Sequence, residues 1–440
     1  MIMKNLLAIF HVFLICYTPG FGQSAGTLTE DGAWCWFSDP RAIYSSKKNS
    51  QVITGWVTSS GDIMAASLDI KNGRIEKKKL YTNLEKDDHD NPAFLELPDR
   101  RILTQYTWHG GSAQGMGVIQ NVTTQGPKVS TFSDSVVLKP TNQKLLDRFK
   151  RETYTYANPF LLSSENNKLY SFGRWIGFKP NFVTSTDNGK TWSDPVVIIT
   201  SKELNTNNRP YVKYFSDGKS RIHLIFTDGH PNAEPLNSVY YCFYENGAFW
   251  RADGSKIATI EQLPFHPSDA TIVYQATPTT GKAWIFDIVV DKKGNLVVAY
   301  TRYPTNDNHQ YYYAVYDGKK WNDHHLIDSG NWFPQTPEGK MEKEQNYSGG
   351  LTIDTLDPSI VYFSHEINGV FEISKGQTSD MGNSWKITPV TRNSKLDNVR
   401  PTIPRYKKPG DKSVLLWMEN KKYVHYTDYD SRIKFHISAP

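Results

Sequence analysis

Two histidines, a tyrosine and an arginine occupy corresponding places in a short pattern that the sequence contains twice. The first copy begins at His89, continues through Asn-Pro into an apolar run, and returns after a polar turn to end at His109. The second copy begins at Tyr156 in the same way and ends at Arg174. Two apolar runs joined by a polar turn predict a β-hairpin, which enters and leaves at the same end. We therefore expect these four side chains along one edge of two sheets.

These residue types, gathered on one edge, suit the removal of a weakly acidic proton beside a carboxylate. His89, His109 and Arg174 can neutralise the carboxylate through charge-assisted hydrogen bonds. Tyr156, with its pKa lowered by Arg174, can take the proton as a phenolate and then pass a proton to a departing oxygen. This is β-elimination on a uronic acid. Tyr154, two residues earlier on the same strand face, is the alternative base.

The same hairpin recurs in weaker form along the chain, seven times in all, with starts about 50 to 80 residues apart. Short apolar runs separated by Asn-Gly and Asp-Gly turns are typical of an all-β chain. Residues 185–192 and 378–385 fit the Asp-box pattern S/T-x-D-x-G-x-T/S-W, which we interpret as a structural turn. Together these repeats predict a seven-bladed β-propeller as a single domain over residues 23–440. A pair of β-sandwiches, the alternative fold, would not explain seven equivalent hairpins.

The ends of the other hairpins supply further residues for the same rim. We expect four of them to contact a substrate, with a tie between blades as the alternative role: Arg209, Tyr347, His365 and Arg400. The rim offers no evident pair of carboxylic acids, which most retaining and inverting glycosidases require. A sialidase-like reaction at a tyrosine would also need an acidic partner. These observations favour elimination over hydrolysis.

Residues 1–22 predict an export signal, because Lys4 precedes an apolar core and small residues follow it. That core is too short to span a membrane. We therefore expect a secreted or periplasmic protein without a membrane span, and we expect it to be a monomer. A net charge of +5 without a basic stripe argues against nucleic-acid binding. An aromatic content of 13% is typical of β-rich proteins that act on carbohydrates. Beyond the signal, Cys35 and Cys242 form one disulfide or remain two thiols.

The chain resembles the BNR-repeat proteins that include the seven-bladed ulvan lyases. The resemblance spans nearly all of residues 23–440 and rests on the HDNP and YANP hairpin openings and on residues 34–41 (WCWFSDPR), 228–231 (DGHP), 247–254 (GAFWRADG) and 347–350 (YSGG). It implies a site built from two histidines of one blade and a tyrosine and an arginine of the next. By that analogy Tyr156 is base and acid, and Arg174 lowers its pKa and helps to hold the uronate. His89 and His109 would neutralise the carboxylate.

The resemblance also implies an anionic polysaccharide substrate, ulvan or a similar rhamnose–uronate polymer, and chemistry that needs no cofactor. Some family members carry a structural zinc, for which His230 and Cys242 are residues of suitable type here. Two other functions stay open. A glycoside hydrolase acting on rhamnose–glucuronate ends would work from the opposite face, but the histidine near Arg41 that would support it is missing from residues 20–88. A non-catalytic glycan-binding propeller would not need the His, Tyr and Arg set.

Overall fold

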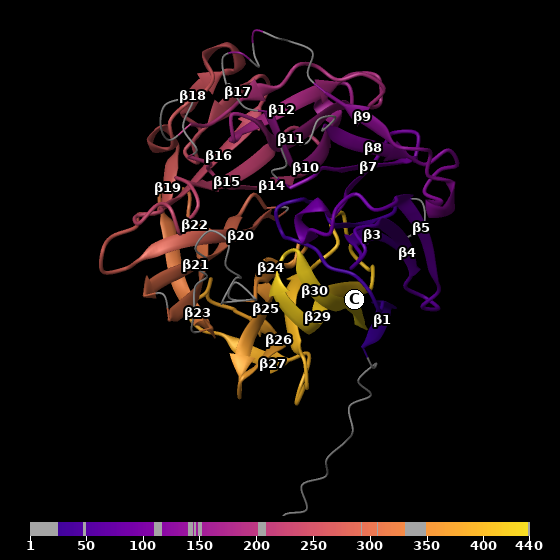
Figure 1. The fold of residues 1–440 in the computed structure, drawn as a ribbon. Coiled ribbons are helices and arrows are strands. Elements are labelled where there is room, and N and C mark those ends of the chain that lie inside the picture. Colours follow the sequence, from indigo (N-terminus) through magenta and orange to yellow (C-terminus); the bar gives the residue numbers. More distant parts are fainter. Residues whose placement is uncertain are drawn as a thin grey trace, which may run out of the picture.

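The structure of the protein is a computed structural model, and it describes residues 25–46, 50–109, 117–139, 144, 147, 152–200, 208–291, 293–305, 307–330 and 349–438. The expected export signal lies outside these residues. The strands form seven sheets that follow one another around a ring (Figure 1). The predicted all-β, seven-bladed propeller is therefore confirmed, and each of the seven hairpins contributes the first two strands of one sheet or blade.

Chain order follows the ring from blade to blade. Blade 1 contains β2 (Ala42–Tyr44), β3 (Gln51–Val57), β4 (Ile63–Asp69) and β5 (Ile75–Tyr81), and blade 2 contains β6 (Ala93–Glu96), β7 (Ile102–Tyr106), β8 (Val118–Val122) and β9 (Val136–Leu138). Blade 3 contains β10 (Glu152–Leu162), β11 (Lys168–Ile176), β12 (Lys179–Ser185) and β13 (Val196–Val197). Blade 4 contains β14 (Val212–Ser216), β15 (Ile222–Thr227), β16 (Val239–Glu245), β17 (Ala248–Trp250) and β18 (Lys256–Thr259), with β19 (Thr271–Tyr274) added on β16.

Blade 5 contains β20 (Lys282–Val290), β21 (Leu296–Thr305), β22 (Asn308–Tyr316) and β23 (Trp321–Gly330). Blade 6 contains β24 (Leu351–Ile353), β25 (Ile360–Ile367), β26 (Val370–Gln377) and β27 (Lys386–Pro389). Blade 7 contains β28 (Asp397–Thr402), β29 (Ser413–His425) and β30 (Asp428–Ser438). Short 3₁₀ turns lie between strands: η1 (Asp88–Asp90), η2 (Val129–Thr131), η3 (Ser163–Glu165), η4 (Ile260–Gln262) and η5 (Pro267–Asp269).

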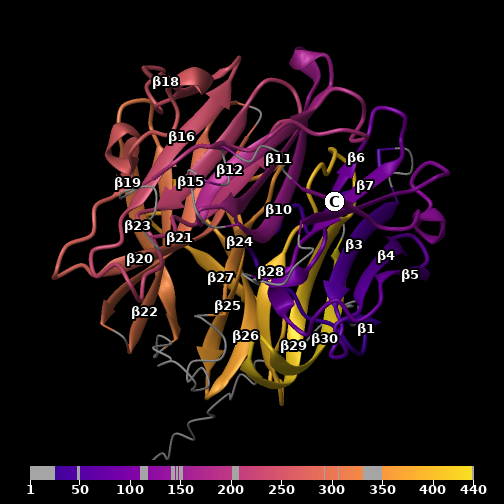
Figure 2. The ribbon, with the colours of Figure 1, turned by 45° about the horizontal axis from the view of Figure 1, so that its top comes forward.

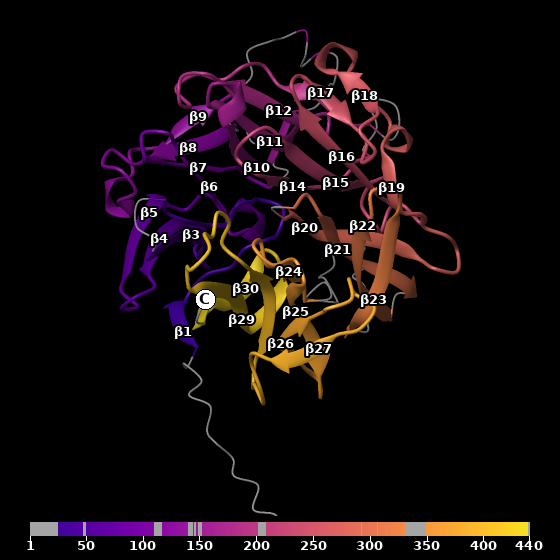
Figure 3. The same ribbon diagram turned by 180° about the vertical axis from the view of Figure 1, so that it is seen from behind.

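The two ends of the described chain close the ring together. The fourth strand of blade 7 is β1 (Gly26–Thr29), which pairs antiparallel with β30 so that Thr27 faces Lys434. Figures 2 and 3 show β1 beside β30 and β29, with the indigo start of the chain against its yellow end. This pairing gives blade 7 four strands and ties the first described strand to the last, and a closed propeller leaves only short, protected sheet edges.

Residues 34–41, here called the axial segment, connect the blades at the centre of the ring. Trp36 donates its Nε1–H to the carbonyl of Ile285 in blade 5, at 3.2 Å. The ring of Phe37 lies 5.4 Å from that of Tyr156 in blade 3 and 4.8 Å from that of Tyr211 beside blade 4. The centre of the propeller is therefore filled by aromatic side chains on the side where the hairpins open.

The asparagines of the two Asn-Pro openings hold the axial segment in place. The side-chain oxygen of Asn91 accepts a hydrogen bond from the backbone N–H of Cys35 at 3.0 Å. The corresponding oxygen of Asn158 accepts one from the N–H of Asp39 at 2.8 Å. The repeated asparagine thus has a structural role, since it satisfies backbone donors that would otherwise be buried without partners.

Both predicted Asp-boxes form the expected turns at the outer side of their blades. Asp187 accepts hydrogen bonds from the backbone N–H of Lys190 and Thr191, at 3.0 and 2.9 Å. Asp380 accepts one from the N–H of Ser384 at 2.9 Å. Among the residues with a described structure, no helix has the length and apolar character needed to cross a membrane.

Candidate active site

The histidines His89 and His109 lie at the opening and the closing of the inner hairpin of blade 2. Asp87 caps η1, and its Oδ1 accepts the backbone N–H of His89 at 2.9 Å and lies 2.8 Å from Nδ1 of that ring. Its Oδ2 lies 2.8 Å from Nδ1 of His109. One carboxylate therefore holds both imidazoles, whose centroids are 3.8 Å apart and whose planes are 5° from parallel. Both side chains stay partly exposed, at 15% and 18%.

Tyr156 reaches the histidines through an irregularity in blade 3. The pairing of β10 with β11 shifts register within residues 155–158, and Tyr156 has a φ of +65°. A β-bulge re-aims the side chain that it carries, and a left-handed φ is rarely adopted by tyrosine and costs energy. Trp175 stabilises the bulge by donating its Nε1–H to the Tyr156 carbonyl at 2.8 Å. The Tyr156 ring consequently lies 6.0 Å from His89 and 6.3 Å from His109.

Arg174, near the end of β11, joins a second tyrosine to the cluster. Its guanidinium is 5.1 Å from the Tyr156 ring and 4.8 Å from the ring of Tyr211, which directly precedes β14. The two phenol rings are 6.3 Å apart. Tyr211 was not among the predicted site residues. Its place at the opening of the fourth hairpin is the signal that could have identified it.

The two phenols of the cluster have pKa values shifted in opposite directions. Burial acts to raise the pKa of Tyr211, but the charges of Arg174 and Arg209 outweigh burial, and the pKa is lowered. For Tyr156, burial and the charge of Tyr211 raise the pKa well above its usual value. Arg174 does act to lower the Tyr156 pKa, as expected, but burial and Tyr211 outweigh it, so the expected lowered pKa of this phenol is wrong. Of the two phenols, Tyr211 thus loses its proton more readily and Tyr156 keeps its proton more firmly.

The stacked imidazoles also differ in pKa. Burial acts to lower the pKa of both rings. For His89, nearby groups outweigh it, Cys35 first and then Tyr156, and the pKa is raised well above its usual value. For His109 burial prevails over the opposing effect of Asp87, and the pKa is lowered. One charged and one neutral ring can stack closely without like-charge repulsion.

Carboxylates gather behind the histidines, a feature that the hairpin pattern does not reveal. Besides Asp87, Glu85 accepts a hydrogen bond from the backbone N–H of His109 at 2.7 Å. Asp88 and Asp90 are fully buried. Burial raises the pKa of Glu85, and burial together with Asp87 raises that of Asp90 well above its usual value. Of these four acids, Asp87 and Asp88 contact an imidazole, at 2.8 and 3.0 Å from Nδ1 of His89.

Arg209 and Arg400, both expected to contact substrate, have different surroundings. Arg209 lies beside the cluster, with its guanidinium 5.7 Å from the Phe178 ring. Arg400 is only 3% exposed. Its Nη1 donates to Asp88 Oδ2 at 2.5 Å and to the carbonyl of Trp34 at 2.7 Å. Arg400 is therefore a buried tie between blade 7, η1 and the axial segment, and not a residue of the open rim.

The other predicted residues lie elsewhere. His365 ends the inner hairpin of blade 6, where its Nε2 is 3.0 Å from Ser374 Oγ. Tyr347 falls outside the described residues. Tyr154 is 1% exposed and packs in an apolar cluster with Trp175, so its position does not suit the alternative base. A further tyrosine, Tyr426 in the turn between β29 and β30, contacts the site. Its ring lies edge-on to both stacked histidines, at 4.9 and 5.1 Å.

The residues considered for a structural zinc do not fit one. Cys242 lies within an apolar cluster, pairs with Leu224 inside β15, and has its pKa raised by burial. His230 follows the end of β15 and packs against Trp284 at 4.6 Å. Neither belongs to a group of three close His, Cys, Asp or Glu ligand atoms in the described part of the chain. Cys35 and Cys242 are two free thiols.

A larger cavity, of about 1140 Å³, opens at the opposite ends of the inner hairpins. Its walls include the turn residues Asp217 and Asp291. Four basic and five acidic side chains line it: Lys219, Arg221, Arg405 and Lys407, with Asp39, Asp217, Glu245, Asp291 and Asp317. This balance gives the cavity no cationic surplus for an anionic sugar. The His, Tyr and Arg cluster on the other face is therefore the stronger candidate for such a substrate.

Comparison with known proteins places the chain among BNR propellers. Residues 52–329 match the model of a BNR repeat-containing family member. No match was found among curated protein sequences. Several solved structures share the fold.

One of these structures is that of the PL25 ulvan lyase, from a new family of polysaccharide lyases, bound to -[GlcA(1-4)Rha3S]-. It is 16% identical, the alignment covers 94% of this chain and 95% of that chain, and the TM-score is 0.70. The polysaccharide lyase Uly1 is 11% identical over 94% of this chain and 97% of that one, with a TM-score of 0.60. The BP39L lectin from Burkholderia pseudomallei is 9% identical over 94% and 97%, with a TM-score of 0.52. At these identities the likeness establishes the fold.

Proposed function

This chain belongs to the BNR repeat-containing family, and we propose that it is a secreted or periplasmic polysaccharide lyase that cleaves a uronate-containing polymer by β-elimination. The observation that carries the proposal is the position of Arg174, 5.1 and 4.8 Å from the rings of Tyr156 and Tyr211 and in the same cluster as a stacked histidine pair. The likeness to two lyase structures supports it. The substrate proposed is ulvan or a similar rhamnose–uronate polymer.

The first task of such a site is to neutralise the uronate carboxylate, because the proton on the adjacent C5 is otherwise too weakly acidic to be removed. His89, His109 and Arg174 are cationic or hydrogen-bond-donating groups that can bind the carboxylate. Asp87 fixes both imidazoles by its two oxygens, so their orientation is set before substrate binds. Preorganised donors of this kind stabilise the charge that develops on the carboxylate in the transition state.

The two phenols then divide the proton transfers. The Tyr211 phenolate, stabilised by Arg174, takes the C5 proton, and the electron pair of that C–H bond forms the C4–C5 double bond. The C4–O bond breaks, and the departing glycosidic oxygen receives the proton of Tyr156. The products are an unsaturated uronate end and a new hydroxyl end. The cycle closes when the proton gained by Tyr211 is returned to Tyr156, directly or through solvent.

Hydrolysis is less well supported by the same residues. A glycosidase needs one carboxylic acid and one carboxylate on either side of the scissile bond. The acids near this site are unsuited to that role: Asp87 binds both imidazoles, Asp88 binds Arg400, Glu85 accepts the backbone N–H of His109, and Asp90 is fully buried. A purely glycan-binding role would leave the paired phenols and their shared arginine without a purpose.

The test is to incubate the purified protein with ulvan and follow the ultraviolet absorbance of the unsaturated product. Carboxyl-reduced ulvan is the matched control, since it keeps the backbone but has no carboxylate to neutralise. We expect absorbance to rise with ulvan only. Absence of any rise with ulvan and with other uronate polymers would overturn the proposal.

A further inference from the structure

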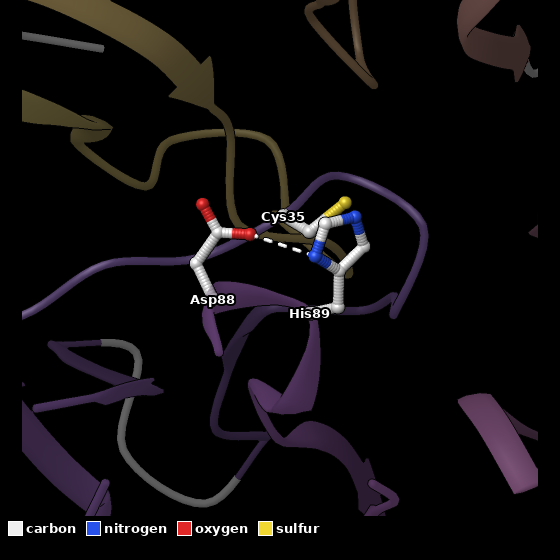
Figure 4. Close-up of side chains that lie close together, drawn as sticks. All are labelled: Cys35, Asp88 and His89. Carbon is white, nitrogen blue, oxygen red and sulfur yellow. Dashed lines mark ion pairs between the residues drawn. The ribbon is translucent and has the colours of Figure 1, made fainter. Parts of the chain in front are cut away.

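Three side chains of different chemistry converge at η1, and one of them belongs to the stacked histidine pair. One ligand atom each from Cys35, Asp88 and His89 lies within 4.8 Å of the other two. Figure 4 shows the Cys35 side chain and the Asp88 carboxylate both directed at the His89 ring. Thiolate, imidazole and carboxylate are the donors from which proteins build Zn²⁺ sites.

The local backbone fixes this arrangement. The N–H of Cys35 donates to the carbonyl of Asp88 at 2.8 Å and to the side chain of Asn91 at 3.0 Å. The axial segment is thereby bonded to η1, which carries both Asp88 and His89. The three donors are consequently brought together by main-chain hydrogen bonds as well as by side-chain packing.

One oxygen of the Asp88 carboxylate remains available to a cation. Its Oδ2 accepts hydrogen bonds from Arg400 and from the hydroxyl of Tyr423. Its Oδ1 is buried and faces Nδ1 of His89 at 3.0 Å. A bound cation would take the place of the proton between these two atoms.

We propose that Cys35, Asp88 and His89 form a binding site for a thiophilic divalent cation of the Zn²⁺ class. Tetrahedral zinc with bonds of about 2.0 to 2.3 Å separates its ligand atoms by roughly 3.5 Å. The three donors lie within 4.8 Å of one another, and Asp88 Oδ1 is 3.0 Å from His89 Nδ1. The fourth position is left for water, as in zinc sites with three protein ligands. The partly exposed His89 side chain gives access from the rim.

A second group, Asp87 with His89 and His109, also has its ligand atoms within 4.8 Å of one another. It fits a metal less well, because a cation there would displace Asp87 from both imidazoles, whereas the Cys35 group involves His89 alone. It also contains no sulfur. The Cys35 group is therefore the better site for a soft cation.

The inference has a consequence that rests on the proposed function. A cation bound to His89 takes that ring away from the uronate carboxylate and adds positive charge near Arg174. Zn²⁺ should therefore inhibit the lyase reaction reversibly, and a chelator should restore it. Mg²⁺ prefers oxygen ligands only and should not inhibit.

Binding is tested without reference to activity by titrating the whole protein with Cd²⁺. Coordination by a thiolate gives an ultraviolet charge-transfer band, and we expect one equivalent of Cd²⁺ to saturate it. Cys35→Ser should abolish the band and weaken Cd²⁺ binding, measured by calorimetry, by more than about tenfold, since even loss of an outer-shell partner costs that much. Cys242→Ser, at the other buried thiol, is the matched control and should keep the band. A band that persists in Cys35→Ser, or no saturable binding to the unmodified protein, would overturn the inference.

If Cys35→Ser does not fold, as judged by circular dichroism, Cys35→Ala takes its place, because alanine keeps the backbone donor to Asp88. The activity arm compares Zn²⁺ inhibition of the unmodified protein with that of the same variants, and we expect Cys35→Ser to resist Zn²⁺ and Cys242→Ser to remain sensitive. Saturable Cd²⁺ binding by a protein with no lyase activity would contradict the proposed function and leave the metal site standing. Lyase activity without a Cd²⁺ band would contradict the metal site and leave the proposed function standing.

Discussion

The imidazole rings of His89 and His109 stack 3.8 Å apart, within 5° of parallel, and both are bound to the two oxygens of one carboxylate. That carboxylate belongs to Asp87, the residue before η1. A shared acceptor removes the rotational freedom of both rings at once. The relationship explains how two side chains twenty positions apart can act as one carboxylate-binding unit.

Replacement of Asp87 by Asn should separate the two rings. An amide offers one acceptor and turns an N–H donor toward the second imidazole, so one of two charge-assisted hydrogen bonds is lost. We expect kcat/KM on ulvan to fall roughly 10- to 100-fold, corresponding to about 1.5 to 3 kcal/mol. Asp99→Asn, at an exposed turn of the same blade, should leave it unchanged. Equal effects of the two variants would contradict the positioning role of Asp87.

The division of labour between the two tyrosines is tested by Tyr156→Phe and Tyr211→Phe. Each variant removes one proton-transfer group, and we expect kcat to fall by about 10²- to 10⁴-fold in both. Tyr154→Phe, on the same strand but within an apolar cluster, should retain most of its turnover. A Tyr211→Phe variant that keeps kcat within tenfold would mean that Tyr156 performs both transfers.

The pH dependence of the reaction should report the lowered pKa of Tyr211. The phenolate is the active base, so activity rises as pH increases through this pKa and is lost below it. Arg174 is the larger of the cationic effects that lower the pKa, and Arg209 the smaller. Arg174→Gln should therefore move the low-pH limb of kcat/KM to higher pH, and Arg209→Gln should move it in the same direction by less. A limb that does not move in either variant would assign it to another group.

The buried pair of Arg400 with Asp88 should matter for stability. Removing one partner leaves the other charge buried without compensation, which typically costs about 3 to 5 kcal/mol. Arg400→Met should lower the free energy of unfolding by that amount, measured by urea denaturation. Arg432→Met, which breaks the more exposed pair with Glu419, should cost less than about 1 kcal/mol. Similar losses in the two variants would contradict the buried tie.

The seven blades were predictable because each inner hairpin is encoded by a short stretch of sequence, two apolar runs around a turn. His89, His109, Tyr156 and Arg174 were predictable for the same reason, since they stand at hairpin ends. Tyr211 was not, because its hairpin opening lacks the Asn-Pro spacing of the first two copies. Arg400 also stands at a hairpin end, but its burial depends on a contact with Asp88, 312 positions away. Such contacts arise only when the ring assembles.

The direction of the Tyr156 pKa was wrong for a related reason. A nearby arginine lowers a tyrosine pKa when the two are considered alone. In the folded protein Arg174 is shared with Tyr211, and burial acts on both phenols. Sequence spacing shows that Tyr156 and Arg174 are neighbours along one hairpin. It does not show that Tyr211, at the start of the next blade, shares the same arginine.

The pairing of β1 with β30 also has a kinetic consequence. Blade 7 gains its fourth strand only when residues separated by more than 400 positions meet, as Lys434 and Thr27 do. Contacts of such sequence separation are slow to form, because the chain must first lose the entropy of closing a very long loop. Blades 1 to 6 can assemble from neighbouring segments as they emerge, whereas blade 7 must wait for the last strand. Refolding should therefore end with a slow step that completes the ring.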